Sequence, residues 1–337
     1  MNSECPEPAP SDPLAEQVRS GDRRALARAI TLVESTRAQD RDRAEAVLTR
    51  LLPAAGGAVR IGIAGSPGVG KSTLIDAFGL YLIAQGRRLA VLAIDPSSPV
   101  SGGSILGDKT RMTELARAPG AFIRPSPTGG RSGGVGRRTP DAIALCEAAG
   151  FDTVIVETAG LGQSDTAIAE MVDILIVLVP PGGGDSLQGI KRGIMEATDL
   201  VVVTKADGGQ VEEAQRTAGE YQHALRLMRP AAAQWVPRAL VCSALTGTGL
   251  AELWQEIERF SLGLGREGLA RRRSAQALAL LKSEIEEELR LRLADAGLAS
   301  RAAEVEAEVA AGRLTTRAAA RRIVHGLVSA TEKPPAA

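Results

Sequence analysis

The chemistry of this chain is concentrated in one loop, 65–72, which reads GSPGVGKS and fills every fixed position of the phosphate-binding motif GxxxxGK[ST]. An apolar run at 60–64 precedes the loop and a helical pattern at 73–78 follows it, which favours the motif over an ordinary glycine-rich turn. Backbone N–H groups of such a loop point at phosphate oxygens, while Lys71 reaches the β- and γ-phosphates and the Ser72 hydroxyl holds Mg²⁺. The expected nucleotide contacts here are Gly65, Ser66, Gly68, Val69, Gly70, Lys71, Ser72 and Thr73.

Acidic residues follow two of the apolar runs. Glu157 ends the run that starts at Thr153 and occupies the Walker-B position, where a carboxylate orients a Mg²⁺-bound water; a salt-bridged surface glutamate is the alternative. Asp95 follows the run 89–94 and is placed to contact the magnesium shell or orient the attacking water. Asp108 is either a metal-shell residue or the N-cap of a helix at 111–118. With Gly160 donating its N–H to the γ-phosphate, the expected catalytic residues are Lys71, Asp95, Glu157 and Gly160, and the expected metal ligands are Ser72, Asp95, Asp108 and Glu157.

A third segment indicates which base is bound. Residues 204–207 read TKAD and resemble the NKxD motif of GTP-binding proteins, in which the Asp carboxylate accepts two hydrogen bonds that guanine donates and adenine cannot. Thr204 replaces the usual Asn, so the supporting contact to the loop is altered. Residues 243–245 read SAL and match the SAx element whose backbone contacts guanine O6. We therefore expect GTP rather than ATP, bound by Lys205, Asp207, Ser243, Ala244 and Leu245.

The residue after Gly160 is Leu161, where Ras-like proteins have the Gln that positions the attacking water, and Gln163 lies two residues further on. This predicts slow intrinsic hydrolysis that rises when a partner or a second subunit completes the site. Two glycine-rich segments, 125–138 and 180–191, are either plain surface loops or a mobile relay to that partner.

The elements that position these residues alternate short apolar runs with helical stretches. This pattern predicts an α/β fold with a mostly parallel sheet covered on both faces and its ligands at the carboxyl ends of the strands. The expected strands are 60–64, 89–94, 121–124, 153–157, 174–179, 200–204 and 239–242.

Five segments are expected along the chain. The nucleotide-binding domain is 58–262, after a helical segment at 14–57 whose two or three helices break at 20–22. Leu278, Leu281, Ile285, Leu289 and Leu293 give 263–331 the pattern of a long helix, with a break near residue 296 before two shorter helices. That helix is either a dimerisation arm or a helix packed on its own domain. Residues 1–13 and 332–337 are expected to be a disordered leader and tail.

Composition narrows the functional class. The 337 residues include 40 basic and 40 acidic side chains and only two Trp, two Tyr and four Phe, which disfavours nucleic acid and acidic membranes as partners. The run 174–179 is too short to cross a bilayer, and 1–13 lacks the features of a signal peptide or a mitochondrial presequence. Cys5, Cys146 and Cys242 are widely spaced, which is typical of free thiols in the cytoplasm.

Several long segments resemble one family closely. The stretches DPSSPVSGGSILGDKTRM, ETAGLGQSD and PPGGGDSLQGIKRGI, together with GSPGVGKS and TKAD, are similar to the MeaB/MMAA family, sometimes labelled ArgK. These are P-loop GTPases that chaperone adenosylcobalamin-dependent methylmalonyl-CoA mutase. The similarity covers roughly residues 15–262, and the helical C-terminus more loosely.

The resemblance implies a SIMIBI-type GTPase domain, a homodimer and three switch loops at 95–111, 158–165 and 180–191. It also implies that GTP binding and hydrolysis gate cofactor delivery to the mutase and protect the mutase from inactivation. A cobalamin adenosyltransferase is a further possible partner.

Three other functions compete. A nickel-type metal-insertion GTPase relies on His-rich or Cys/His clusters, and this chain has two His and no such cluster. A kinase acting on a transport component, as the ArgK label suggests, needs an acceptor pocket, for which no motif is visible. A partitioning-type ATPase carries Lys after the first glycine of the loop, where this chain has Ser66.

Overall fold

The computed structural model describes residues 12–35, 37–95, 112–127, 138–158, 167–182, 192–228, 235–293 and 296–331. The chain divides into two compact units, Met1–Arg273 and Ser274–Ala337. The expected leader lies outside the described residues up to residue 11, and the first helix starts at Pro13. The expected tail at 332–337 also lies outside them.

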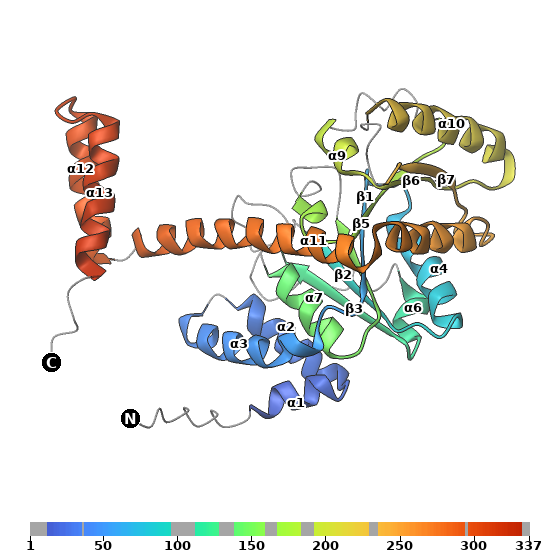
Figure 1. Ribbon diagram of the computed structural model, residues 1–337, viewed down its shortest axis with the longest axis horizontal. Helices are drawn as coiled ribbons and strands as arrows, with labels where there is room; N and C mark the ends of the chain where they lie inside the picture. Colours follow the sequence, from blue (N-terminus) through green and yellow to red (C-terminus); the bar gives the residue numbers. More distant parts are fainter. Residues whose placement is uncertain are drawn as a thin grey trace. The chain divides into compact units, whose positions relative to one another are not determined.

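The larger unit is built on a seven-stranded sheet in which all neighbouring strands are parallel (Figure 1). Strand β1 lies at its centre, between β4 and β5, in the order β3-β2-β4-β1-β5-β6-β7. All seven predicted runs are strands, which confirms the predicted sheet to within a few residues at each end. Their bounds are β1 Val59–Gly65, β2 Leu89–Asp95, β3 Ala121–Pro127, β4 Thr153–Thr158, β5 Ile174–Val179, β6 Leu200–Val203 and β7 Arg238–Val241.

Helices cover both faces of the sheet, because alternate residues of each buried strand point to opposite sides. One core contains Val154, Val156 and Val177, and the other contains Ile155 and Ile176. The first core is covered by α1 Pro13–Arg19, α2 Arg23–Glu34, α3 Ala38–Leu51, α7 Thr139–Ala148, α9 Arg192–Ala197 and α10 Val211–Met228. The second is covered by α4 Lys71–Ala84, α6 Thr113–Arg117 and the first part of α11 Leu250–Leu293. Short 3₁₀ turns are η1 Leu52–Ala54 and η3 Gly208–Gln210.

The N-terminal helices confirm the predicted break at 20–22. Helix α1 ends before Ser20, and Asp22 caps α2 by accepting hydrogen bonds from the backbone N–H groups of Arg24 and Ala25, both at 2.8 Å. These bonds lower the pKa of the Asp22 carboxyl, the one from Ala25 having the largest effect.

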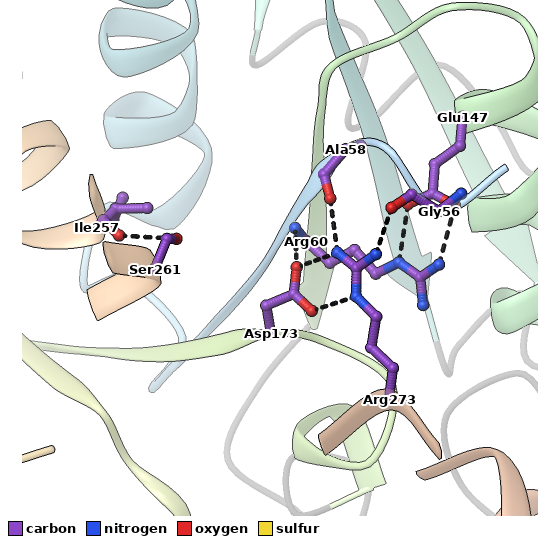
Figure 2. Close-up of polar contacts among 8 residues, drawn as sticks. All are labelled: Gly56, Ala58, Arg60, Glu147, Asp173, Ile257, Ser261 and Arg273. Carbon is purple, nitrogen blue, oxygen red and sulfur yellow. Dashed lines mark hydrogen bonds and ion pairs between the residues drawn. The ribbon is translucent and has the colours of Figure 1, made fainter. Parts of the chain in front are cut away.

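The amino-terminal edge of the sheet carries a network of ion pairs in which buried carboxylates meet partly buried arginines (Figure 2). Arg273 donates to both carboxylate oxygens of Asp173, at 2.7 and 2.6 Å, and to the carbonyl oxygens of Gly56 and Ala58. Arg60 donates to both carboxylate oxygens of Glu147 at 2.9 Å. Next to this network, Arg272 donates to Asp199 at 2.9 Å. The network joins the starts of β1, β5 and β6 to α7 and α11.

The smaller unit is helical. Helix α11 has one non-helical residue, Gly265, at φ 63°, and its part from Ser274 to Leu293 belongs to the smaller unit. Helices α12 Ala296–Ala310 and α13 Thr316–Thr331 follow, as predicted, and Arg322 of α13 pairs with Glu308 of α12 at 3.0 Å. In the part of the chain that the structure describes, no helix is both long and apolar enough to cross a membrane.

Candidate functional site

The phosphate-binding loop connects the central strand β1 to helix α4, which begins at Lys71. Gly68 and Gly70 have φ angles of 79° and 99°, in the left-handed region where a side chain is unfavourable. At Gly65 a Cβ atom would lie 2.8 Å from the carbonyl oxygen of Leu178 in β5. The glycines of the motif are therefore required by the backbone path and by close packing on the neighbouring strand.

Lys71 lies at the first turn of α4 with only 7% of its surface exposed. Its Nζ donates hydrogen bonds to the carbonyl oxygens of Gly65 at 2.7 Å and Ser66 at 3.2 Å. The loop thus holds a positive charge next to its own backbone, as a site for phosphate oxygens requires.

Ser72 and Glu157 come from neighbouring elements and meet at the same edge of the sheet. The Ser72 hydroxyl donates to Glu157 Oε1 at 3.0 Å, and Glu157 is buried at the end of β4. A hydroxyl and a carboxylate are oxygen ligands of the kind that Mg²⁺ prefers, so this pair fits the predicted metal. Asp95 ends β2, whose partner β4 pairs Glu157 with Ala93, so the backbone places Asp95 at this edge too.

The other predicted residues of the metal and switch segments lie outside the described residues. These are Asp108, Gly160, Leu161 and Gln163, together with most of the loops 95–111, 158–165 and 180–191. Their roles stay predictions.

The TKAD segment lies beside the phosphate loop. Thr204 is buried, and its hydroxyl donates to the carbonyl oxygen of Val69 at 2.7 Å. Lys205 has a φ of 56°, the one positive value that a non-glycine residue takes among the described residues, and its Nζ donates to the carbonyl oxygen of Gly68 at 2.9 Å. The contact of Thr204 with the loop is therefore a hydrogen bond from a hydroxyl instead of an amide. The sequence reasoning noted the substitution but missed this bond, which the hydroxyl of Thr makes possible.

The SAL element is tied to the same segment. Ser243 Oγ donates to Asp207 Oδ2 at 2.6 Å, and the backbone N–H of Ala206 donates to the carbonyl of Cys242 at 3.1 Å. Ala244 is half-buried, whereas Leu245 is 81% exposed at the outer end of the turn. The structure therefore brings together the two segments that are predicted to bind the base, and Ser243 fixes the Asp207 carboxylate from one side. The sequence reasoning assigned Ser243 to the base but missed that its side chain holds Asp207.

Two of the three cysteines lie within the described residues. Cys146 and Cys242 are free and buried, and burial raises the pKa of both thiols, that of Cys242 to about 12. Cys5 lies outside the described residues. No group of three or more His, Cys, Asp or Glu that could hold a metal occurs in the ranges that the structure describes.

The parallel sheet, the glycine loop and the buried lysine define a P-loop nucleotide-binding protein. A family model described as "Methylmalonyl Co-A mutase-associated GTPase MeaB" matches residues 26–297. The chain belongs to this family, as its resemblance predicted.

Curated relatives agree with this assignment. A probable GTPase of Mycobacterium tuberculosis is 55% identical over 267 residues, which are 79% of this chain and 80% of the relative. The "GTPase ArgK" of Escherichia coli is 48% identical over 280 residues, 82% of this chain and 85% of the relative. The mouse protein "Methylmalonic aciduria type A homolog, mitochondrial" is 49% identical over 267 residues, 76% of this chain and 64% of the relative.

Among solved structures, one described as a "LAO/AO transport system kinase" superimposes with a TM-score of 0.73 at 36% identity, over 94% of this chain and 96% of that one. The predicted SIMIBI-type P-loop fold is confirmed by this match and by the sheet topology.

Proposed function

We propose that this chain binds and hydrolyses GTP, and that the nucleotide state gates adenosylcobalamin delivery to methylmalonyl-CoA mutase and protects that enzyme. The observation that carries the nucleotide choice is the Asp207 carboxylate, held by Ser243 within a segment that is itself bonded to the phosphate loop. A fixed carboxylate at this position accepts the N1–H and N2–H donors of guanine, which adenine lacks.

In the proposed site, the loop from Gly65 to Thr73 holds the phosphates with its backbone N–H groups and with Lys71. Lys71 stabilises the negative charge that develops on the β–γ bridging and γ oxygens. Glu157 and Asp95 orient the attacking water, and the N–H of Gly160 contacts the γ-phosphate. Lys205 lies over the base, and Ala244 and Leu245 complete the pocket around guanine O6.

Mg²⁺ fits this set of residues, since Ser72 and Glu157 already present two oxygen ligands 3.0 Å apart. We propose Ser72, Glu157, Asp95 and Asp108 as its direct or water-mediated ligands. When bound, the ion neutralises charge on the β- and γ-phosphates.

Base choice is tested with Asp207→Asn. An amide donates where the carboxylate accepted, so the variant should bind GTP more weakly and gain affinity for xanthosine triphosphate, whose donor pattern is reversed at that position. The two dissociation constants can be measured by fluorescence competition. An equal loss of affinity for both nucleotides would show that Asp207 does not contact the base.

We expect the intrinsic hydrolysis to be slow, because Leu161 lacks the amide that positions water in Ras-like proteins. A single-turnover assay with and without methylmalonyl-CoA mutase tests this. The rate should rise when the mutase is added, whereas fast turnover by the isolated chain would contradict the proposal.

The partner assignment rests on the family description, which names the mutase. A pull-down with adenosylcobalamin-dependent methylmalonyl-CoA mutase, in the presence of GDP or a non-hydrolysable GTP analogue, should show retention that depends on the nucleotide. A cobalamin adenosyltransferase, included in the same experiment, tests the second proposed partner. Retention independent of nucleotide would argue against gating.

We propose further that the segment 263–331 is a dimerisation arm. Leu278, Leu281, Ile285 and Leu289 of α11 are all about half exposed or more and recur at spacings of three and four residues. Such an apolar stripe favours pairing with a second copy. Light scattering should give a dimer for the native chain and a monomer for Leu281→Glu combined with Leu289→Glu.

A kinase is the second candidate, because the matched structure is described as a transport system kinase. Product analysis distinguishes the two: a GTPase releases inorganic phosphate, whereas a kinase transfers it to an acceptor. We expect free phosphate.

A further inference from the structure

Helix α6 is capped by a side chain from another helix. Its N-cap position, for which the sequence suggested Asp108, is occupied by Met112, whose side chain makes no capping hydrogen bond. Instead, Asp76 of α4 accepts the backbone N–H of Leu115 at 3.0 Å. The first N–H groups of a helix have no partner within the helix and need an acceptor from elsewhere. Asp76 therefore has the role for α6 that an N-cap side chain has in other helices.

Helices α4 and α6 also pack closely against each other (Figure 1). A Cβ atom on Gly79 of α4 would lie 2.7 Å from side-chain atoms of both Leu115 and Leu89. Met112 and Leu115 are fully buried in the core that α4 covers. The missing side chain at Gly79 thus allows α6 to come close enough to α4 for the hydrogen bond with Asp76.

Asp76 shares one face of α4 with the predicted metal ligand Ser72. Ser72, Asp76 and Gly79 are spaced by four and three residues, so they form a single stripe along the helix. At the start of the stripe the Ser72 hydroxyl donates to Glu157, and further along it Asp76 and Gly79 contact α6. The same helix therefore carries the predicted phosphate and metal groups in its first turn and holds α6 one turn later.

The bond to Asp76 fixes one end of the connection between β2 and α6. That connection starts after Asp95, which ends β2, and α6 begins at Thr113. Both ends are attached to elements of the candidate site, since β2 pairs with β4, which carries Glu157, and α6 is bonded to α4, which carries Lys71. Fixing the two ends of a connection reduces the number of conformations open to the residues between them.

We infer that Asp76 is a positioning residue for GTP hydrolysis. It acts by holding α6, and with it the end of the connection that starts at Asp95, against the helix of Lys71 and Ser72. This inference rests on the proposed function. Loss of the Asp76 bond should slow hydrolysis and leave the affinity for GDP nearly unchanged, because the bond lies one helical turn beyond the residues that are proposed to contact the phosphates.

The experiment compares Asp76→Ala, which removes the acceptor, with Asp76→Asn, which keeps a carbonyl oxygen. Three quantities are measured: the single-turnover rate of GTP hydrolysis, the dissociation constant for GDP, and hydrogen exchange in the peptide that contains Leu115. Asp76→Ala should hydrolyse GTP about tenfold more slowly, as expected for one lost hydrogen bond to a carboxylate, and should bind GDP within about threefold of the native chain. Its Leu115 amide should exchange faster. Asp76→Asn should stay close to the native chain in all three.

Glu114→Ala is the matched control, because Glu114 is an exposed acid of α6 that pairs with Arg117 of the same helix. It should hydrolyse GTP at the native rate. Gly79→Ala is the second variant, and it decides the matter if Asp76→Ala does not fold. Its added Cβ presses on Leu115 and should slow hydrolysis although the Asp76 carboxylate is still present.

The inference is overturned if both Asp76→Ala and Gly79→Ala hydrolyse GTP at the native rate. It is also overturned if Asp76→Ala loses GDP affinity by the same factor as it loses rate, because Asp76 would then support the nucleotide site as a whole. A native chain that does not hydrolyse GTP would refute the proposed function, and the role of Asp76 with it. Native hydrolysis that Asp76→Ala leaves unchanged would refute only the role of Asp76.

Discussion

The two edges of the sheet use polar groups in opposite ways. At the carboxyl edge, Lys71, Thr204 and Lys205 donate hydrogen bonds to backbone carbonyls of the glycine-rich loop. At the amino edge, Arg273 donates to Asp173 and to backbone carbonyls, and Asp173 also accepts the backbone N–H of Arg60 (Figure 2). The polar groups of the carboxyl edge shape a loop that we propose to bind a nucleotide, whereas those of the amino edge pair with one another.

The charges at the amino edge depend on one another. Asp173 is 2% exposed, so its carboxylate needs a charged partner. Burial alone would lower the pKa of Arg273, but the hydrogen bonds and charge of Asp173 outweigh burial and raise that pKa, so the guanidinium stays charged. Substitutions at the carboxyl edge should therefore weaken nucleotide binding, whereas substitutions at the amino edge should lower the free energy of unfolding.

The largest effect is expected from Arg273→Met. It removes the charged partner of the buried Asp173 carboxylate and the donor to two carbonyls, and removal of one partner of a buried pair costs about 3 kcal/mol or more. Urea unfolding should show this loss, while the folded fraction keeps its preference for GTP. Arg271→Met, an exposed neighbour on the same helix, is the control and should change the unfolding free energy by less than about 0.5 kcal/mol. Equal losses of unfolding free energy in the two variants would show that the pair of Arg273 with Asp173 does not stabilise the fold.

Lys71→Ala should weaken GTP binding strongly and leave the stability of the fold almost unchanged. The loss of a charged donor to phosphate costs about 2–3 kcal/mol of binding, a drop of roughly thirty- to a hundredfold or more in GTP affinity. The melting temperature without nucleotide should stay close to the native value. Lys282→Ala, on an exposed part of α11, is the control and should bind GTP normally. If the Lys71→Ala variant still hydrolyses GTP at the native rate, the assignment of Lys71 to the nucleotide site is wrong.

Ser72→Ala should have a smaller effect, confined to the metal. Without the hydroxyl, the Mg²⁺ concentration needed for half-maximal hydrolysis should rise about tenfold, as expected for one lost ligand interaction. Ser261→Ala is a matched control, because that hydroxyl donates only to the carbonyl of Ile257 one helical turn earlier (Figure 2). An unchanged Mg²⁺ requirement in Ser72→Ala would place the ion elsewhere.

The smallest effect is expected from thiol reagents. The thiolate is the reactive form, and with its pKa raised to about 12 the Cys242 thiol stays protonated at pH 8. Cys146 is fully buried, and its thiol pKa is raised as well. Iodoacetamide should therefore label both only after unfolding, as peptide mapping would show. Rapid labelling of Cys242 in the native protein would mean that the base-binding edge opens readily.

The sequence predicted the strands and the phosphate loop well, because both depend on local patterns. Apolar runs identify buried strands, and GxxxxGK[ST] has a fixed backbone geometry. It did not predict the pair of Asp173 with Arg273, since these residues are a hundred positions apart and each resembles an ordinary surface charge. The bond from Thr204 to Val69 was missed for a related reason: a single hydroxyl carries no periodicity, and its partner becomes visible only when β6 lies beside the loop.

The central claim is that the carboxyl edge of this sheet binds GTP through a held phosphate loop and a single base-reading carboxylate. Calorimetric titration of the native chain with GTP and with ATP, both in Mg²⁺, tests it most directly. The account predicts stoichiometric uptake of GTP and an affinity for ATP lower by about tenfold or more, since the hydrogen bonds to Asp207 are lost. Equal affinities for the two nucleotides, or no uptake of GTP, would contradict it.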